Sequence, residues 1–116
     1  MAYKVRITDS AKAELDEIVA YFVNTLCNPK AAVSLLEDFN EQKSYLYDDP
    51  YTFSLCPILS LQNKGYHRFI FKQNYIALYL IEDEENKKVV TIMHIFNAKR
   101  DYEKVDGGKS GTLGFI

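Results

Sequence analysis

Hydrophobic and polar positions alternate with the period of β-strands in the second half of the chain. Three short runs rich in Tyr, Phe, Ile and Val cover residues 66–72, 75–81 and 89–96, and polar residues separate them. Runs of this length and composition between polar turns are typical of antiparallel strands. The pattern therefore predicts a three-stranded meander, which the first half of the chain is expected to cover.

The segment between the first two runs predicts how they pair. Gln73 and Asn74 are interpreted as a two-residue hairpin loop, because Asn tolerates the positive φ that such loops need. Lys72 then lies opposite Tyr75, and by the same register Arg68 faces the second strand at Tyr79. Opposed residues share a face of the sheet, so this loop decides which side chains meet the core.

The predicted pairing divides the strands into an open face and a core face. The open face is expected to carry Tyr66, Arg68, Ile70, Lys72, Tyr75, Ala77, Tyr79 and Ile81. The core face is expected to carry His67, Phe69, Phe71, Ile76, Leu78 and Leu80. In the third strand, where a slip of one residue would exchange the faces, we place Val90, Ile92, His94 and Phe96 toward the core and Val89, Thr91, Met93 and Ile95 on the open face.

In the first half of the chain, the spacing of hydrophobic residues changes from that of a strand to that of a helix. Residues 3–8 alternate and predict a first strand. Thr8 is expected to cap a helix that runs to about Leu26, with Asp9 in the first turn, where a carboxylate suits the helix dipole. Apolar residues recur at three- and four-residue steps and predict one buried stripe. The stripe consists of Ala11, Leu15, Ile18, Val19, Phe22, Val23 and Leu26.

Asn28 and Pro29 predict the start of a second helix, because Asn is a good N-cap and Pro suits the first helical position. This helix is expected to run to about Tyr45 or Leu46 and to end before Pro50. The connection between the two helices is short, so they are expected to pack antiparallel as a hairpin.

The order of elements predicts an α+β fold, a helical hairpin packed on a mostly antiparallel four-stranded sheet (β-α-α-β-β-β). A chain of 116 residues with 47% hydrophobic content supports one core. We expect a single domain over residues 1–106 and a Gly-rich tail over residues 107–116. Residues 51–65 have no clear period and are expected to form a long loop with a turn near residues 59–61.

The composition argues against a membrane protein, a disulfide-bonded protein and a metal-binding protein. The N-terminus has no apolar signal core and the apolar runs are too short to cross a membrane, so we expect a cytoplasmic protein with no membrane partner. Cys27 and Cys56 lack CxxC spacing and are expected to be reduced thiols. His67 and His94 are the only histidines, and no ligand spacing accompanies them. We therefore expect no metal and no small-molecule cofactor.

The net charge of −2 argues against a protein that holds nucleic acid by bulk electrostatics alone. Residues 1–60 carry five Lys/Arg and nine Asp/Glu, whereas residues 61–116 carry nine and seven. Much of the acid in the second half lies at residues 82–85, and such a run is typical of a solvated loop. The strands and the C-terminal segment are therefore basic.

Five residues form the candidate binding cluster of the open face: Tyr66, Arg68, Lys72, Tyr75 and Tyr79. Cations interleaved with aromatic rings suit a nucleic-acid strand, because cations contact phosphates and rings stack on bases. They equally suit a protein partner, since Tyr and Arg are enriched at interface hot spots. An ordinary polar sheet face with amphipathic side chains is the third interpretation.

His94, Arg100 and Tyr102 lie at the end of the last strand or just beyond it. His94 is interpreted as a hydrogen-bonded structural histidine or as a general acid or base. Arg100 and Tyr102 would reach the same end of the sheet, and solvation at the surface is the simplest interpretation of both.

The order of strand, helical hairpin, meander and the sequence KRDY at residues 99–102 resembles the RelE/ParE superfamily of bacterial toxins from type II toxin–antitoxin modules. The resemblance covers residues 3–105. Its most specific parts are YHRFIFK at residues 66–72 leading to YIALY at residues 75–79, and VTIMHI at residues 90–95 leading to RDY at residues 100–102.

The RelE-like branch of this superfamily enters the ribosomal A site and cleaves mRNA. In that branch the resemblance implies Arg68 and Arg100 as a phosphate clamp, with Tyr102 or His94 as proton carrier. However, the RelE and YoeB patterns place a catalytic Arg second in the strand that corresponds to residues 75–81, and this position is Ile76. This departure disfavours an endoribonuclease.

The ParE-like branch inhibits DNA gyrase by protein contact and has no need of that catalytic set. The missing Arg and the acidic balance favour this branch, in which the chain is a growth inhibitor and not an enzyme. A toxin-fold protein that has lost toxicity and only binds its partner is a third hypothesis. In each case the resemblance implies a cognate antitoxin, a flexible segment that folds along the toxin and shields its site.

Overall fold

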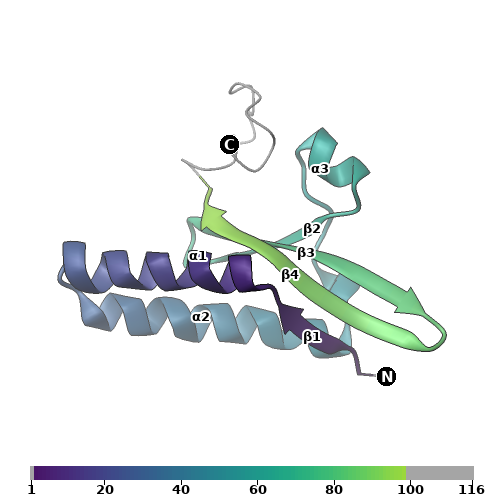
Figure 1. Cartoon of the computed structure of the whole chain (residues 1–116), viewed down its shortest axis with the longest axis horizontal. Coiled ribbons are helices and arrows are strands. Elements are labelled where there is room, and N and C mark those ends of the chain that lie inside the picture. The colour runs from purple at the N-terminus through teal and green to yellow at the C-terminus, as the bar shows by residue number, and fades with distance from the viewer. Residues whose placement is uncertain (1, 99–116) are drawn as a thin grey trace.

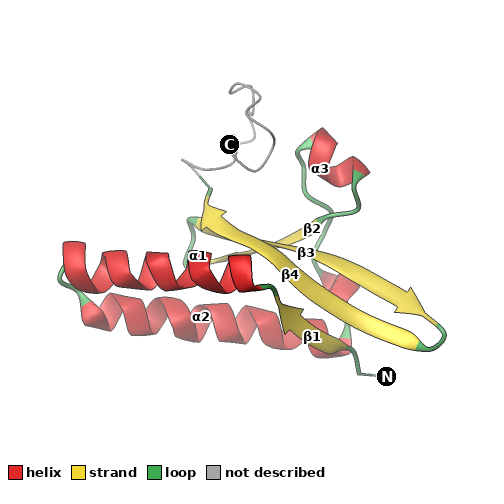
Figure 2. Ribbon diagram, in the orientation of Figure 1, coloured by secondary structure: helices red, strands yellow, loops and turns green. Residues whose placement is uncertain are grey.

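The computed structural model describes residues 2–98, and these form two helices packed on one face of a four-stranded sheet (Figures 1 and 2). The elements in chain order are β1 (Lys4–Ile7), α1 (Asp9–Ala20), α2 (Pro29–Asp48), α3 (Leu59–Asn63), β2 (His67–Phe71), β3 (Tyr75–Glu84) and β4 (Lys87–Asn97). The strand order is β1-β4-β3-β2, with β1 parallel to β4 and the other pairs antiparallel. The expected α+β fold is confirmed.

Both helix starts lie where the sequence predicts them. The side chain of Thr8 accepts a hydrogen bond from the N–H of Ala11 at 3.0 Å, and the side chain of Asn28 accepts one from the N–H of Ala31 at 3.1 Å. Each bond satisfies one of the donors that a helix leaves free at its first turn. Pro29 occupies the first turn of α2, where its missing N–H costs nothing.

Helical structure ends at Thr25, close to the predicted Leu26, but its last turn is not α-helical. Helix α1 ends at Ala20, and the chain continues as a π-helical turn over Tyr21–Thr25. Val23 and Leu26, which the predicted stripe buries, are exposed. Figure 1 shows that the connected ends of α1 and α2 project beyond the strands, although Phe22 in the π-helical turn still contacts Tyr75 of β3, with ring centroids 6.1 Å apart.

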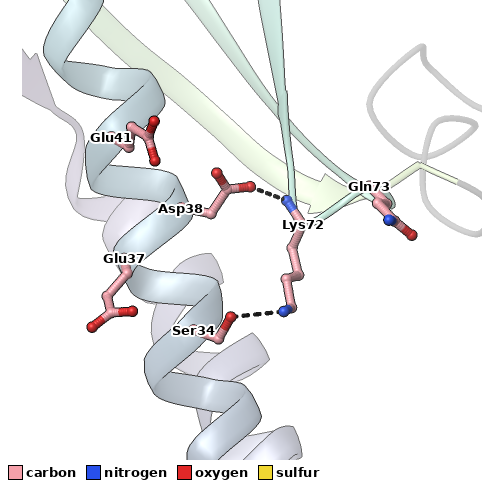
Figure 3. A pocket seen from close by; sticks show the side chains of 6 residues that line it. All are labelled: Ser34, Glu37, Asp38, Glu41, Lys72 and Gln73. Carbon is pink, nitrogen blue, oxygen red and sulfur yellow. Dashed lines mark hydrogen bonds between the residues drawn. The ribbon is translucent and has the colours of Figure 1, made fainter.

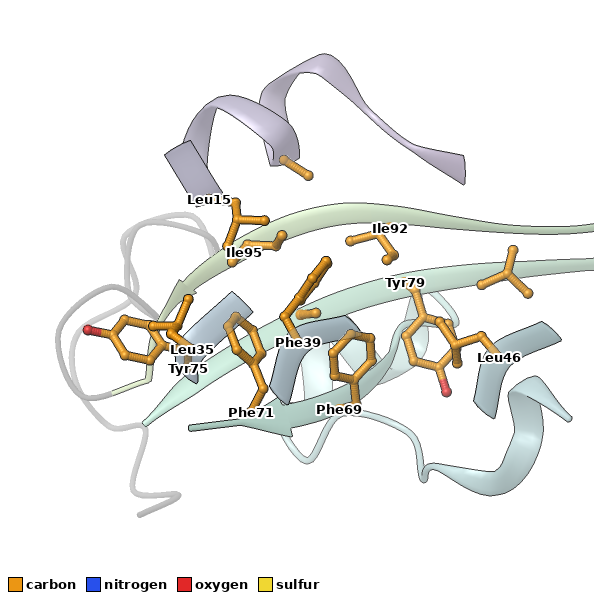
Figure 4. Close-up of a cluster of buried hydrophobic side chains, with 13 residues drawn as sticks. Leu15, Leu35, Phe39, Leu46, Phe69, Phe71, Tyr75, Tyr79, Ile92 and Ile95 are labelled. Carbon is orange, nitrogen blue, oxygen red and sulfur yellow. The ribbon is translucent and has the colours of Figure 1, made fainter. Parts of the chain in front are cut away.

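The main core lies between the helical pair and the sheet (Figure 4). Phe39 of α2 contacts the rings of Phe69 and Phe71 in β2, with centroids 5.8 and 5.1 Å apart. Leu35 and Leu46 extend the same contact along α2 and are fully buried. Aromatic pairs at these separations stabilise a core beyond the area that they bury.

The predicted pairing of β2 with β3 is wrong by one residue. The loop has three residues, because Lys72 and Gln73 both adopt positive φ, at 50° and 68°, and Phe71 lies opposite Tyr75. Tyr79 therefore lies opposite His67, not Arg68, and its ring stacks on that imidazole at 5.5 Å.

The shift exchanges the faces of β3. Tyr75, Ala77, Tyr79 and Ile81 point toward the helices, and Tyr79 is 0% exposed. Ile76, Leu78 and Leu80, which were expected in the main core, lie on the opposite face. A register error of one residue has this effect because side chains alternate along a strand.

A β-bulge in β4 reverses the faces a second time. The register changes from Leu78 opposite His94 to Tyr79 opposite Ile92, which leaves Met93 without an opposed residue. Val90 and Ile92 lie on the helix side as expected, but so does Ile95. His94 and Phe96 lie on the other face, contrary to the prediction, because an extra residue in one strand shifts all later side chains.

Residues 51–65 are more ordered than the predicted loop. Residues 54–56 run beside β2, where the N–H of Cys56 donates to the carbonyl of Tyr66 at 2.8 Å. Helix α3 then forms at the predicted turn. Together they build a second apolar cluster on the sheet face opposite α1 and α2. Its buried residues are Cys56, Ile58, Leu61, Ile76, Leu78 and Phe96.

Replacing Tyr79 by Phe is expected to lower the free energy of unfolding by about 1–2 kcal/mol. The buried hydroxyl of Tyr79 donates to the carbonyl of Pro50 at 2.7 Å, and burial raises the pKa of this phenol well above its ordinary value. Without the hydroxyl the carbonyl is left buried and unpaired. Urea unfolding of both proteins measures the loss, and Tyr45→Phe, at an exposed ring, is the matched control.

Candidate functional site: the outer face of the sheet

The face of the sheet opposite α1 and α2 is called the outer face here. The alternation of the paired strands places these side chains on it: Lys4, Arg6, Tyr66, Arg68, Ile70, Leu80, Thr91 and His94. None of the eight is fully buried, whereas Ile76, Leu78 and Phe96 between them are covered by the second apolar cluster. The outer face is therefore a polar and basic surface around a small apolar centre.

Arg68 and His94 belong to one row of this face. Leu78 of β3 lies between them, opposite Arg68 on one side and His94 on the other. Two strand spacings separate their backbones, or about 10 Å. A guanidinium and an imidazole at that separation can contact one ligand together.

His94 also faces a carboxylate of α1. Its Nδ1 lies 3.7 Å from Oε2 of Glu14, while Oε1 of Glu14 accepts a hydrogen bond from the N–H of Ile95 at 2.8 Å. The Nδ1 atom is buried and makes no hydrogen bond within the described part of the chain. Protonation of His94 would therefore create an ion pair with Glu14.

Lys4 and Arg6 are members of the outer face that the sequence analysis did not identify. Lys4 lies opposite Val89 and Arg6 lies opposite Thr91, and both side chains are exposed. The alternation of residues 3–7 already separates these cations from Tyr3, Val5 and Ile7. The sequence therefore showed that Lys4 and Arg6 share a face. It did not show that this face is also the face of Arg68.

Contrary to the prediction, Lys72 does not lie on the outer face. Its N–H donates to Oδ2 of Asp38 at 2.6 Å and its Nζ donates to Oγ of Ser34 at 2.7 Å, so both bonds hold it against α2 (Figure 3). The side chains around it line a hollow of about 460 Å³. They are Ser34, Glu37, Asp38, Glu41, Lys72 and Gln73. These contacts indicate that Lys72 stabilises the turn between β2 and β3 against α2.

The predicted five-residue cluster is therefore divided by the structure. Tyr66 and Arg68 lie on the outer face, whereas Tyr75 and Tyr79 are buried on the helix side. Arg100 and Tyr102 lie outside the described residues. The expected alignment of two cations with three rings on an open face is wrong, because it depended on a two-residue turn.

A separate polar cluster surrounds Asp83, near the end of β3. The carboxylate of Asp83 accepts hydrogen bonds from Tyr3 at 2.9 Å, from Tyr51 at 3.1 Å and from Nζ of Lys88. The bond from Lys88, followed by that from Tyr3, lowers the pKa of Asp83. Loss of solvent and the bond to Asp83 raise the pKa of both phenols. This cluster ties the start of the chain to the β3–β4 hairpin.

We expect Asp83→Asn to flatten the dependence of stability on pH in the acid range. The unfolded chain binds a proton at Asp83 more readily than the folded chain, so the cluster contributes fully above the ordinary carboxyl pKa and loses its effect as the pH falls through the lowered one. Thermal unfolding between pH 7 and pH 3 measures this, with Glu85→Gln as the control. Equal slopes in the original chain and Asp83→Asn would contradict the assignment.

Two further observations concern metal binding and membrane-spanning helices in the described part of the chain. Among residues 2–98, no three side chains of the metal-binding types gather into a group that could hold an ion. No helix in that range has both the length and the apolar character needed to cross a bilayer.

The comparisons with known proteins agree with this geometry. The sequence matches the family described as the ParE toxin of the type II toxin–antitoxin system parDE over residues 5–102. The chain belongs to the ParE toxin family. The match begins at the second residue of β1 and runs past the end of β4, so it includes the helical hairpin and all of the sheet except Lys4. Membership implies a cognate antitoxin as partner.

A solved structure supports the fold of this ParE family member. This chain is similar to the structure titled "Chromosomal ParDE TA system from P. aeruginosa", with a TM-score of 0.65 and 21% sequence identity. The match covers 83% of this chain and 96% of the chain in that structure. No curated protein matches this chain by sequence. At that identity the likeness is one of fold, and the target has to be argued from the residues.

Proposed function

We propose that this ParE family member stops bacterial growth by binding DNA gyrase in the cytoplasm through protein contact. The observation that carries the proposal is the position of Ile76, which takes the place of the catalytic Arg in the RelE and YoeB patterns. Ile76 is 1% exposed and packs in the second apolar cluster. A buried aliphatic side chain at this position supplies no cation for a scissile phosphate.

The outer face has the composition of a protein-binding surface. Arg68, Tyr66 and Arg6 surround an apolar centre, and Ile70 at the edge is 45% exposed. Arg and Tyr around apolar side chains are enriched where binding energy concentrates at protein interfaces. We assign target contact to this face, with Arg68 of the edge strand β2 as its main contact residue. Arg100 and Tyr102 remain predicted members of the site.

Cleavage of mRNA on the ribosome is the second candidate function, and one observation favours it. Arg68 and His94 lie in the same row of the outer face, so a cation and a proton carrier are both present. Their use in cleavage would also need Arg100 and Tyr102. The third hypothesis, partner binding without toxicity, predicts no arrest of growth at all.

Two experiments separate these functions. Tightly controlled expression of the chain alone is expected to arrest growth, and continued growth at a verified protein level would favour the non-toxic hypothesis. The purified protein is then added to a gyrase supercoiling assay and, in parallel, to translating ribosomes. Loss of supercoiling with intact mRNA is expected. Codon-specific cuts without any effect on supercoiling would refute the gyrase proposal.

A further inference from the structure

The β-bulge of β4 directs the side chain of His94 to the outer face. Met93 has no opposed residue in β3, so the side chains after it change faces, and His94 leaves the helix side that a regular strand would give it. Two residues outside the strand hold the bulge. The hydroxyl of Thr8 donates to the carbonyl of Met93 at 3.3 Å, and Oε1 of Glu14 accepts from the N–H of Ile95 at 2.8 Å. The imidazole is therefore held at a defined place on this face.

The two ring nitrogens of His94 have different surroundings. Nδ1 is buried, makes no hydrogen bond within residues 2–98, and lies 3.7 Å from Oε2 of Glu14. The side chain as a whole is 34% exposed, and Nε2 is neither buried nor hydrogen-bonded in the same part of the chain. One nitrogen therefore faces a carboxylate, while the other is open to a ligand on the outer face.

The carboxylate of Glu14 determines which nitrogen of His94 carries the proton. In the neutral ring, a proton on Nδ1 faces the carboxylate favourably, whereas a lone pair there would face negative charge. Nε2 is then a hydrogen-bond acceptor. When the ring takes up a second proton, Nδ1–H pairs with Glu14 and Nε2–H becomes a donor. Protonation of His94 therefore adds one positive charge and one donor to the outer face.

The other groups around His94 leave this proton uptake to Glu14. Within residues 2–98, Glu14 is the only charged residue at ion-pair distance from His94. Glu17 is exposed one turn further along α1, and β3 places the apolar Leu78 opposite His94. Arg68 lies beyond Leu78 at about 10 Å, where salt screens most of its repulsion. The second apolar cluster and its border add two titratable groups that are uncharged near neutral pH, the thiol of Cys56 and the phenol of Tyr66.

We propose that Glu14 positions His94 as a proton-dependent contact of the target-binding face, where protonated His94 donates from Nε2 to a carboxylate of the target. The proposal rests on the gyrase assignment and names the chemistry of the partner surface: two acidic groups about 10 Å apart, one for His94 and one for Arg68. Hydrogen bonds between two charged groups are stronger than those between neutral groups. The outer face therefore binds an acidic surface more tightly as the pH falls through the range in which histidine gains its charge.

Nitrogen NMR of the histidine side chains tests the role of Glu14 in the free chain. At about pH 8, where the ring is neutral, the proton of His94 is expected on Nδ1. Glu14→Gln can still accept from the N–H of Ile95, but its amide donates to Nδ1 and should move the proton to Nε2. Glu17→Gln makes the same charge change one turn away and should leave the proton on Nδ1. A proton on Nε2 in the original chain would overturn the proposal.

The affinity for purified gyrase at about pH 6 and about pH 8 tests the contact itself. The original chain is expected to bind about threefold to fivefold more tightly at the lower pH, the gain typical of a partly exposed ion pair. His94→Gln and His94→Asn keep a polar side chain but take up no proton, so they should lack this gain. Groups that titrate on gyrase affect all three proteins alike, so the difference between them is the readout. An equal gain in the original chain and both variants would refute the contact.

The outcomes separate this proposal from the proposed function. The position of the proton is measured without any target. If the proton lies on Nδ1 but gyrase is bound at neither pH, the gyrase proposal fails and the contact fails with it, whereas the positioning of His94 by Glu14 stands. If gyrase is inhibited and binds the original chain and the His94 variants with the same pH dependence, the toxin function stands and the role of His94 is refuted.

Discussion

Replacing Phe39 by Ala is expected to lower the free energy of unfolding by about 3–5 kcal/mol. Phe39 is 3% exposed, and its ring contacts those of Phe69 and Phe71. Truncation removes this contact between α2 and β2 and leaves a cavity that rigid neighbours do not fill. Typical domains are stable by about 5–15 kcal/mol, so much of the stability would be lost.

Urea unfolding followed by circular dichroism measures this change, with an exposed residue of the same helix as control. Val33 lies on α2 and is 55% exposed, so Val33→Ala should change the free energy of unfolding by less than about 0.5 kcal/mol. A loss below about 1.5 kcal/mol for Phe39→Ala would mean that the contact between α2 and β2 is not the centre of the core.

Arg68→Ala is expected to raise the concentration needed for half-inhibition of gyrase at least tenfold. A tenfold change corresponds to about 1.4 kcal/mol of binding energy, which is within the range of single hot-spot residues. The side chain of Arg68 lies on the outer face and makes no ion pair within residues 2–98, so its removal should leave the fold intact. Supercoiling assays over a dilution series measure the effect.

Lys64→Ala is the matched control, because it removes one exposed cation next to α3 at the same change in net charge. It should inhibit gyrase as the original chain does. Thermal unfolding should give similar midpoints for both variants. If Arg68→Ala remains fully inhibitory, target contact does not involve the β2 side of the outer face.

Local chemistry in the sequence determined the helical hairpin and the number of strands. Thr8, Asn28 and Pro29 act within one turn of their own helix, so their caps could be predicted without knowing any distant residue. The alternation of residues 66–71 and 89–92 likewise depends only on neighbours. Membership of the RelE/ParE superfamily followed from the same order of elements and was confirmed by the family match.

The tertiary structure alone decided which side chains share the outer face. The turn after β2 has three residues with Lys72 and Gln73 at positive φ, and the carboxylate of Asp38, which accepts the N–H of Lys72, comes from α2. Likewise, Glu14 of α1 binds the N–H of Ile95 beside the bulge at Met93. Each contact joins residues more than thirty positions apart, so no local pattern reveals it.

The sequence by itself determined the two long helices, the four strands, their order and their family, because caps and hydrophobic periods act through nearest neighbours. Only the packed structure decided the register, because a single extra residue in a turn or a bulge exchanges the two faces of a strand. That choice placed Tyr75 and Tyr79 in the core and brought Lys4 and Arg6 to the face of Arg68. Burial of the aromatic rings against α2 favours this register, since it removes the larger apolar area from water.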